Sequence, residues 1–528
     1  AAMALRDGEA RSHASLAVAV GVAASAGAAA LMLRRVLAER AARRRHGADV
    51  EPLPCAWPWL PLLGNALAYK GDPSAFLERQ RRQLGDVFLL DLAGLRIAVV
   101  SGRQEMMQAA TAAESALSAR AAAADFGFGM TLGDINVYFG TDLHRMVLKE
   151  TGIGAASPTV RSSLERAVAA AADEALPREG GVVPDAFAAL RRMSLHAVLL
   201  HLVGKEALRV CDAGLRERRS RHRDFLSWYM AFQDMVEDAT AKGIALPSCV
   251  AQLLVHGPVR TERHRLQRAL ATALEEVWGA EGHGEWLRTV QAFGSRGSIP
   301  AWRRYLERSQ SLLYRPPPAD EPIGPEDAAE LIVGLLFAAH KNPAIGAAQT
   351  LALLLEHPEE HRKVVAELGS GAEPQALRRS LQETLRLTAH ALGAIRRVVA
   401  HDGVALGPAG GRRFHVPRGC YVAMSHVLPN RNPWVFEDPF EFRPDRFADG
   451  QTFDDYQLTT FSHGLHKCPG RAYAMAMMEL MLSEVFRRYD TAPVGKLPPI
   501  DFTRATLAQR AGPCALKLTP RAGAQRPS

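Results

Sequence analysis

The chain lacks the features that mark several protein classes. Its six cysteines are scattered without paired spacing, which argues against a disulfide framework and for a reducing compartment. No Ser/Gly-rich or acidic linker interrupts residues 53–521, no internal repeat is present, and aromatic residues make up only 7% of the chain. The remaining composition, 48% hydrophobic and 23% charged, is typical of a globular protein with a large core.

Acidic residues are too few to balance the basic ones, so the net charge is +8. Much of the excess lies in one block, which holds Arg34, Arg35, Arg40 and the run Arg43-Arg44-Arg45. A basic surface suits anionic lipid or an acidic protein partner. Because the arginine clusters lack a recognisable nucleic-acid-binding motif, we expect no nucleic-acid partner.

One uncharged stretch near the N-terminus, residues 14–33, is long enough to cross a membrane. A helix of this length spans about 30 Å, the thickness of the hydrocarbon layer. We predict a transmembrane anchor at 14–33, with residues 1–13 as a lumenal tail and the Arg-rich side in the cytoplasm. Two alternatives stay open: a signal peptide cleaved near Ala24-Ser25-Ala26, and an organelle transit peptide.

The rest of the chain divides into three predicted parts. Residues 34–61 form a basic, proline-rich linker, in which closely spaced prolines exclude helix and favour a stiff extended chain. Residues 62–521 form a single catalytic domain, and residues 522–528 form a disordered tail. This division places all the motifs discussed below in one domain.

The hydrophobic pattern predicts a mainly α fold with a small β-sheet at one edge. A short helix is expected at 73–84, and a hairpin at 87–92 and 95–101 around Ala93-Gly94. The pattern is mostly helical from about 105 to 380 and includes a short helix at 142–151 and a helix at 376–388. A long helix should begin at Pro325 and reach about His357. Strands are predicted at 394–399, 404–406, 420–425 and 515–518.

Cys468 is the most informative residue, because it immediately precedes a predicted apolar helix. The positive end of the helix dipole and free backbone N–H groups favour a thiolate there. Gly464 and Gly470 allow the backbone to bend tightly and to approach a flat group. A thiolate presented in this way is a good axial ligand for heme iron. The alternatives are a buried structural thiol and a zinc site that uses His463 and His466.

The segment 461–470 resembles the heme-ligand loop of the cytochrome P450 family, since Phe461, Gly464, His466, Cys468 and Gly470 fill its motif positions. The resemblance implies the cytochrome P450 fold and a heme b cofactor. It also implies that Cys468 binds the iron, and that Phe461 and Gly470 belong to the cofactor-binding loop.

Two further segments resemble the same family. Glu383 and Arg386 match its Glu-x-x-Arg helix, and their spacing places both side chains on one helix face. Arg446, in the segment 439–447, matches the third partner. In the family these three residues form a buried network that braces the cysteine loop. The alternative for Glu383 and Arg386 is an exposed pair worth about 0.5 kcal/mol or less.

The long helix departs from the family pattern of an acid followed by threonine. Lys341 stands at the place of the acid and Asn342 at the place of the threonine. Pro343 has no N–H to donate to the carbonyl of Ala339, so the helix should kink there. We predict that Asn342 and His340 are catalytic. The alternative is that His340 and Lys341 point away from the cofactor and have no chemical role.

Other positions resemble the sterol 14-demethylase, sterol 7-hydroxylase and prostacyclin-synthase group of the family. His466, at a position where most members have Arg, and Lys149 look like sterol 14-demethylases, whereas Asn342 looks like the other two. Heme carries two propionates, and buried carboxylates require cationic partners. By position we expect Arg396, His466 and Lys149 to supply them, with Arg397 as a register alternative to Arg396.

The resemblance implies a heme-thiolate monooxygenase that inserts one oxygen atom of O2 into a hydrophobic, sterol-like lipid. Electrons would come from NADPH through NADPH-cytochrome P450 reductase, with cytochrome b5 as a candidate second donor. The expected location is the endoplasmic reticulum membrane, with the catalytic domain in the cytoplasm; a plastid membrane is the alternative. Two rival functions are a non-oxidative heme isomerase or dehydratase of lipid peroxides, and a heme-binding protein that is not an enzyme.

Overall fold

A computed structural model describes ten stretches of the chain, which form two compact units. Unit 1 contains the described residues up to Ser118 and the segment Leu392–Leu428, and unit 2 contains Ala119–Ala391 and Pro429 onward. Neither unit is a continuous piece of chain. The described stretches are 50–60, 62–127, 154–217, 220–243, 251–278, 324–389, 391–408, 411–448, 451–503 and 507–521.

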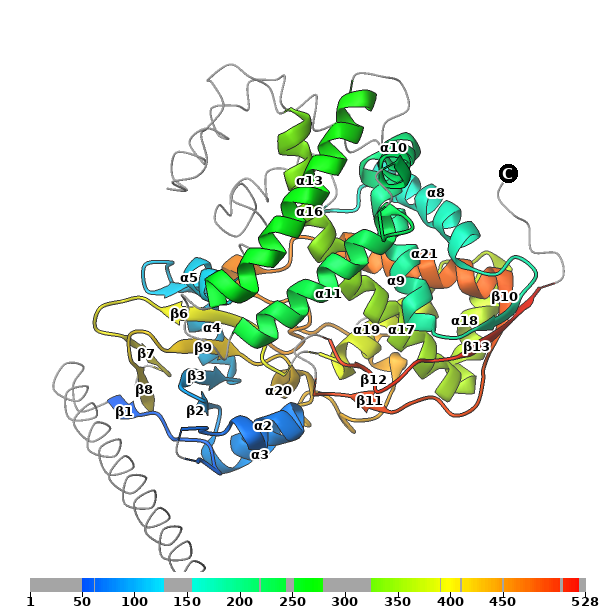
Figure 1. Cartoon of the computed structure of the whole chain (residues 1–528). Coiled ribbons are helices and arrows are strands. Elements are labelled where there is room, and N and C mark those ends of the chain that lie inside the picture. Colours follow the sequence, from blue (N-terminus) through cyan, green and yellow to red (C-terminus); the bar gives the residue numbers. More distant parts are fainter. Residues whose placement is uncertain are drawn as a thin grey trace, which may run out of the picture. The chain divides into compact units, whose positions relative to one another are not determined.

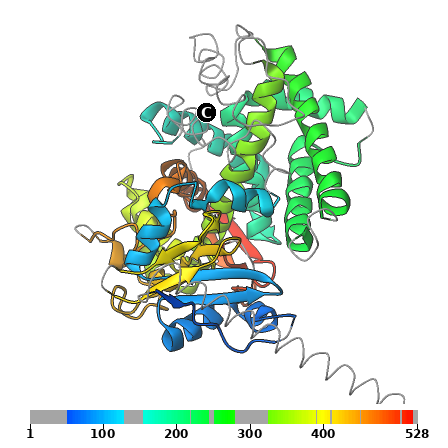
Figure 2. The same ribbon diagram turned by 90° about the vertical axis from the view of Figure 1, so that its left-hand side faces the viewer.

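Unit 1 is built around a five-stranded sheet in the order β2-β3-β9-β6-β4. β2 and β3 are antiparallel, β3 and β9 are parallel, and β9 and β6 are antiparallel. Both views show these strands side by side (Figures 1 and 2). The elements of this unit are β1 (Val50–Pro52), α2 (Ala66–Gly71), α3 (Pro73–Leu84), β2 (Val87–Leu92), β3 (Leu95–Val100), α4 (Arg103–Thr111), β4 (Leu117–Ser118), β6 (Ala394–Val398), β7 (Val404–Leu406), β8 (Arg413–Val416) and β9 (Tyr421–Met424).

Local sequence explains the β2–β3 hairpin turn and the start of α3 in unit 1. The hairpin between β2 and β3 turns at Ala93 and Gly94, which both have positive φ, 53° and 92°, as a tight hairpin turn requires. α3 begins at Pro73 because the Asp72 side chain accepts a hydrogen bond from the N–H of Ala75 at 2.9 Å. Both the hairpin and the bounds of α3 confirm the sequence predictions.

Unit 2 is predominantly helical. Its first part contains α5 (Ala119–Asp125), α8 (Pro158–Ala175), β5 (Gly181–Val183), α9 (Ala186–Leu202), α10 (Gly204–Glu217), α11 (Phe225–Gly243), η1 (Ala251–His256) and α13 (Gly257–Val277). The chain continues with α16 (Pro325–Ala339), α17 (Lys341–Glu356), α18 (Pro358–Ser370) and α19 (Gln375–Leu387). After α20 (Val427–Asn430) at the boundary come η2 (Pro444–Phe447), η3 (Gly464–His466), α21 (Arg471–Arg488), β10 (Tyr489–Pro493), β11 (Ile500–Asp501), β12 (Gln509–Arg510) and β13 (Leu516–Pro520).

The long helix predicted from 325 to about 357 consists of α16 and α17, separated at His340. The interruption lies next to Ala339, whose carbonyl has no N–H partner at Pro343. The combined segment Ala328–Glu356 is the one helix in the described part that is long and apolar enough to cross a membrane, and 72% of its apolar 18-residue stretch is buried in the protein. α9 and α10 are together also long and apolar enough, but the chain bends by 114° between them. The high burial of α16–α17 identifies it as a core helix.

The core of unit 2 forms where α17 meets α21. Gly346 of α17 permits this close packing, because an added Cβ would lie 2.4 Å from the sulfur of Met478 and 3.2 Å from a methyl carbon of Leu385. Met478 and Leu385 are themselves buried. The helix that begins after Cys468 is therefore held directly against the long helix and against α19.

The predicted fold class is confirmed, since helices dominate and the sheets are small. The prediction of one edge sheet was too simple, because the described residues form four sheets. β13 pairs with β10, which lies close in the sequence, and with β5, which lies more than 300 residues away. The predicted anchor at 14–33, the basic part of the linker, the helix at 142–151 and the tail at 522–528 lie outside the described residues.

Candidate functional site

Cys468 lies between the short helix η3 and α21, in a loop closed by its own backbone. The N–H of Cys468 donates to the carbonyl of Phe461 at 2.8 Å. Gly464 has φ 65°, a conformation that favours glycine. Gly470 instead has an ordinary φ of −94°. The bend expected at Gly464 is therefore confirmed. The φ of Gly470 does not require glycine, and its close approach to a flat group stays a prediction.

The side chain of Cys468 is exposed. Nearby protein atoms still desolvate the thiol and raise its pKa, while a hydrogen bond from the N–H of Gly470 and the charge of Arg471 act in the opposite direction. The expected net preference for thiolate is therefore not present in the protein alone. The two favourable contacts nevertheless show that the start of α21 directs donors and positive charge toward the sulfur.

The geometry decides against both alternatives for this cysteine. A buried structural thiol is excluded because the side chain is exposed. His463 is fully buried with its ring 5.0 Å from the ring of Tyr456, whereas His466 is half-buried. Among the described residues, no group of three or more His, Cys, Asp or Glu side chains is placed to hold a metal ion.

Phe461 is half-buried at the start of the loop, and the guanidinium carbon of Arg471 lies 5.5 Å from the centre of its ring. This cation–π contact joins the first residue of the loop to the first residue of α21. Together with the Cys468–Phe461 hydrogen bond, it fixes both ends of the segment that presents the sulfur.

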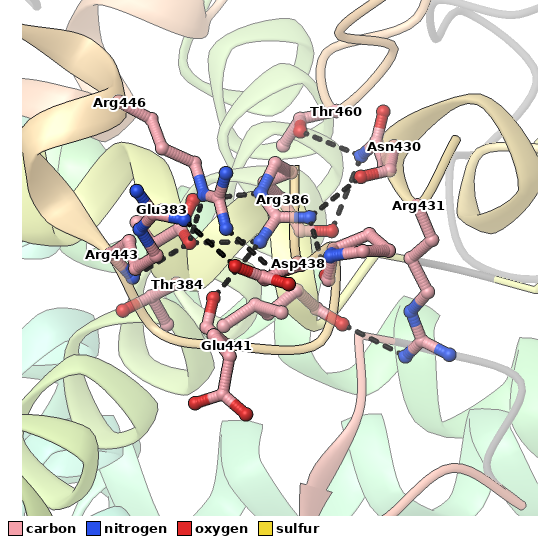
Figure 3. Close-up of polar contacts among 12 residues, drawn as sticks. Glu383, Thr384, Arg386, Asn430, Arg431, Asp438, Glu441, Arg443, Arg446 and Thr460 are labelled. Atoms are coloured by element: carbon pink, nitrogen blue, oxygen red, sulfur yellow. Dashed lines mark hydrogen bonds and ion pairs between the residues drawn. The ribbon is translucent and has the colours of Figure 1, made fainter. Parts of the chain in front are cut away.

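Glu383 and Arg386 of α19 form a fully buried, two-pronged ion pair (Figure 3). Nε and Nη2 of Arg386 donate to the two carboxylate oxygens of Glu383 at 2.7 and 2.8 Å. Nη1 of Arg386 also donates to the carbonyls of Asn430 and Pro439, at 2.7 and 2.8 Å. The alternative of an exposed surface pair is excluded, and the i,i+3 spacing supplies a buried crosslink instead.

Arg446 completes the predicted network from η2. Its Nε donates to Glu383 at 3.2 Å, and its Nη2 donates to the carbonyl of Asp438 at 2.7 Å. Burial lowers the pKa of Arg446, although the Glu383 charge opposes this shift. The backbone N–H of Arg443 also donates to Glu383, at 2.9 Å. The structure therefore brings Glu383, Arg386 and Arg446 together as the sequence predicted.

Asn430 connects this network to the cysteine loop, and sequence reasoning missed it. Its side-chain oxygen accepts hydrogen bonds from the N–H and hydroxyl of Thr459 at 2.8 and 3.0 Å. Its amide nitrogen donates to the hydroxyl of Thr460 at 3.3 Å (Figure 3). The buried Asn430 thereby fixes the two residues that precede Phe461. No local motif indicates this role, because the partners lie about 30 residues away.

On the long helix, Asn342 is exposed and so is Ala338 one turn earlier, although their neighbours are mostly buried. Residues four apart share a helix face. This face, here called the open face, is the exposed part of the middle of α16–α17. The predicted catalytic residue Asn342 belongs to it.

His340, the other predicted catalytic residue, lies on a different face and is fully buried. Its Nδ1 donates to the carbonyl of Leu336 at 2.6 Å, and its ring packs edge-on against Tyr229 at 5.6 Å. The hydroxyl of Ser194 donates to the His340 carbonyl at 2.9 Å. Burial lowers the pKa of His340 to about 3. The structure therefore separates His340 from Asn342 and gives it a packing role, a correction to the prediction.

Lys341 is also turned away from the open face. It forms an ion pair with Glu237 of α11 and is largely buried, and burial lowers its pKa although Glu237 opposes the shift. The position that the family fills with an acid is thus used here to tie α17 to α11. This agrees with the alternative that Lys341 has no chemical role.

The remaining predicted cofactor contacts belong to unit 1 or lie outside the described residues. Arg396 belongs to β6 of unit 1, where it is buried and its Nη1 donates to the carbonyl of Ile395 at 2.9 Å. Arg397, its register alternative, is half-buried on the same strand. Lys149 is outside the described residues. A propionate contact at each of these positions stays a prediction.

Comparison with known proteins agrees with this geometry. Residues 317–518 match the family model for cytochrome P450. The chain is similar to a sterol 14-demethylase of Arabidopsis thaliana, with 26% identity over 189 residues, 33% of this chain and 38% of that protein. It is 33% identical over 175 residues to a sterol 14alpha-demethylase of Mycolicibacterium vanbaalenii, covering 30% of this chain and 37% of that protein. The matched segments thus span under two fifths of the length of these relatives.

Among solved structures, the heme domain of cytochrome P450DA superposes with a TM-score of 0.65. The match covers 91% of this chain and 99% of that domain at 18% sequence identity, so it speaks for the fold alone. The Cys468 loop, the Glu383–Arg386–Arg446 network and the open face of the long helix all fall within the segment 317–518. The chain has the cytochrome P450 fold, and its segment 317–518 matches the cytochrome P450 family model.

Proposed function

We propose that the protein is a heme-thiolate monooxygenase that inserts one oxygen atom of O2 into a hydrophobic, sterol-like substrate. The observation that supports this most directly is the exposed sulfur of Cys468 at the start of α21. The buried Glu383–Arg386 pair and Asn430 hold the loop that presents this sulfur. A thiolate ligand pushes electron density toward heme iron and favours O–O cleavage, so a braced single thiol suits oxygen activation.

The residues fit a heme group. Cys468 would hold the iron, Phe461 and Gly470 belong to the binding loop, and His466, Arg396 and Lys149 are the proposed partners of the propionates. Heme bound in this way would supply activation of dioxygen, using electrons delivered from NADPH by a reductase. The protein raises the pKa of the Cys468 thiol through desolvation, so the coordinated metal charge would complete the stabilisation of the thiolate.

The open face of the long helix would position the oxygen chemistry. Ala338 has a small side chain that leaves space, and Asn342 offers an amide donor and a carbonyl acceptor. An amide orients a water molecule or an oxygen ligand but does not ionise, so it relays protons less readily than a hydroxyl group. Because Lys341 is paired with Glu237, proton supply on this face would depend on water held by Asn342.

The sterol-like substrate class is supported by the relatives named sterol 14-demethylase and by His466. We further propose that NADPH-cytochrome P450 reductase is the electron donor and that the protein resides in the endoplasmic reticulum membrane. Both rest on what the family resemblance implies and on the uncharged stretch at 14–33.

The test of the iron ligand is the Cys468→Ala variant, compared with Cys211→Ala, which removes a buried thiol of the same unit. Cys468→Ala should abolish the thiolate type of heme spectrum and its carbon-monoxide band, whereas Cys211→Ala should retain both. A carbon-monoxide band unchanged in Cys468→Ala would refute the ligand assignment.

A second candidate is a heme isomerase or dehydratase that rearranges lipid peroxides without a reductase. The observation in its favour is the exposed Asn342, with no acid or hydroxyl at positions 341 and 342. Incubating lipid hydroperoxides and sterols with the purified protein, with and without reductase and NADPH, separates the two. Product that requires reductase and O2 supports the monooxygenase, and hydroperoxide rearrangement without them supports the isomerase.

A further inference from the structure

Glu479 lies in the buried middle of α21 and is held by arginines from two other helices. Its side chain is only 6% exposed. Nη2 of Arg161, from α8, donates to Oε1 of Glu479. Nε and Nη2 of Arg378, from α19, donate to Oε2 and Oε1 at 2.6 and 3.2 Å. These three residues, here called the Glu479 clamp, join α21 to α8 and to α19 through one carboxylate.

The apolar contacts of α21 define its position less sharply than the clamp does. Three of its buried side chains are methionines: Met477, Met478 and Met481. Methionine is flexible and adapts to irregular gaps, so it specifies one packing arrangement poorly. The guanidinium of Arg378 is planar and donates to both carboxylate oxygens, which fixes distance and direction together. We therefore expect the clamp to limit sliding and rotation of α21.

The position of α21 in turn sets the position of the Cys468 sulfur. Cys468 lies just before Arg471, the first residue of α21. The N–H of Ala474 donates to the carbonyl of Gly470 at 2.8 Å, so the end of the loop is tied to the first turn of the helix. The N–H of Gly470 and the charge of Arg471 both act on the thiol. A shift of α21 would move both groups relative to the sulfur.

α19 holds the chain on both sides of this sulfur. Arg386 of α19 donates to the carbonyl of Asn430 at 2.7 Å. The side chain of Asn430 accepts from the N–H of Thr459 at 2.8 Å, which fixes the segment before the sulfur. Arg378 of the same helix contacts Glu479, which fixes the helix after the sulfur. The two attachments act on different segments, so the first does not replace the second.

A gain in stability does not by itself explain the clamp. The side chains of Arg161 and Arg378 keep 38% and 31% of their surface exposed, so water hydrates them with or without Glu479. Apolar residues of similar size can often replace a buried ion network without loss of stability. The fixed geometry of the charged contacts is the property that such residues do not reproduce.

We propose that Glu479 is a positioning residue, which holds α21 at the axial position and rotation that present the Cys468 sulfur to heme iron. This role rests on the proposed function, because it requires Cys468 to bind the iron. The order of the loop before α21 does not require iron binding, so it can be measured separately.

The first test is the carbon-monoxide spectrum of heme-loaded Glu479→Gln. The amide keeps the size of the side chain but removes its charge, so the share of heme with the thiolate type of band should fall. The matched control is Glu484→Gln on the same helix. It breaks the 2.5 Å pair with Arg488, which still contacts Asp173 of α8, and it should keep the full thiolate band.

Hydrogen exchange on the same heme-loaded proteins measures the order of the loop. Amides of residues 459–470 should exchange about tenfold faster in Glu479→Gln, the effect of losing one charge-assisted hydrogen bond. Their rates should be unchanged in Glu484→Gln. If the unaltered chain has no thiolate band, the assignment of Cys468 as the ligand fails, and the exchange rates still show whether Glu479 orders the loop.

Arg378→Lys decides the question if Glu479→Gln does not fold. Lysine keeps the positive charge but lacks the fork that donates to both oxygens of Glu479. The thiolate share and the loop protection should therefore fall in the same direction, by smaller amounts. A lower unfolding free energy with an unchanged thiolate band and unchanged exchange rates would overturn the proposal, because the clamp would then only stabilise the fold.

Discussion

At the scale of single residues, Asn342 distinguishes this chain from the acid-and-threonine pattern of its family. It is exposed on the open face of the long helix, while its neighbour Lys341 is committed to an ion pair with Glu237. Replacing Asn342 with Thr would introduce a hydroxyl that both donates and accepts a proton. For the proposed monooxygenase activity we expect Asn342→Thr to raise the amount of product formed per NADPH consumed, measured with reductase present.

The matched control for this change is Lys341→Met, which alters the adjacent residue on the buried side. It should lower stability by leaving Glu237 without its partner, and it should leave the product-to-NADPH ratio unchanged. If Asn342→Thr has no effect on that ratio, proton relay at this position does not limit coupling.

His340 makes the stability of the fold depend on pH. Its folded-state pKa is lowered to about 3 by burial, whereas an unfolded histidine has a pKa of about 6.5. The stabilisation is complete above about pH 6.5 and is lost as the pH falls toward 3, because only the unfolded chain takes up the proton. Between about pH 6.5 and 3, titration of His340 should lower the free energy of unfolding by about 1.4 kcal/mol for each unit by which the pH falls.

Denaturant titrations at several pH values test this expectation. His340→Phe keeps an aromatic contact with Tyr229 but removes the titrating group, so its unfolding free energy should vary less with pH. His201, whose pKa is lowered to about 4 by burial, leaves a residual slope of the same sign. Identical slopes for His340→Phe and the unaltered chain would contradict the burial of a neutral His340.

At the scale of elements, Glu383 in α19 should matter far more than an equally spaced surface pair. Glu383→Ala would leave Arg386 buried without a charge partner, at a cost of about 3–5 kcal/mol. Glu206 and Arg209 of α10 have the same i,i+3 spacing and a 2.6 Å contact, but both are exposed, so Glu206→Ala should change stability little. Chemical denaturation measures both, together with heme content. Comparable losses in the two variants would argue that burial of the Glu383 pair is unimportant.

The contact between α17 and α21 gives a second prediction at this scale. Gly346→Ala would bring a Cβ to 2.4 Å from the buried sulfur of Met478, and overpacking of this kind costs about 1–3 kcal/mol. Gly214 in α10 has open space around its Cβ position, so Gly214→Ala should raise stability by about 0.5–1 kcal/mol through its helix preference. Thermal denaturation should therefore show a lower midpoint for Gly346→Ala and a higher midpoint for Gly214→Ala. A higher midpoint for Gly346→Ala would show that α17 and α21 separate easily.

The elements also show what local sequence could predict. The predicted bounds of α3 are confirmed, and Asp72, Pro73 and Gly85 explain them, because caps and helix-breaking residues act within a few positions. The break in the long helix followed from Pro343 in the same way. The role of Asn430 did not follow from any local pattern, since hydrogen bonds to residues about 30 and 44 positions away create it. The side of the helix on which His340 lies is likewise set by packing against α9 and α11.

At the scale of the whole molecule, the chain leaves unit 1 after Ser118 and returns to it at Leu392. The central pairing of β3 with β9 therefore joins segments more than 300 residues apart. Hydrophobic patterns predicted both strands but not their pairing, because strand partners depend on the path of the entire chain. The family resemblance supplied the global fold and the buried network, while the residues alone supplied Cys468 as a candidate ligand and the kink at Pro343.

Heme should stabilise the folded chain, because a ligand that binds only the folded state raises the free energy of unfolding by mass action. The gain is about 4 kcal/mol when the free ligand is a thousandfold above its dissociation constant. Heme-loaded protein should thus show a higher thermal midpoint than heme-free protein, and Cys468→Ala should lose most of this difference. Cys420→Ala removes a buried thiol of unit 1, so it should lower both midpoints while preserving the gap between them. An undiminished gap in Cys468→Ala would mean that heme is held mainly by groups other than this sulfur.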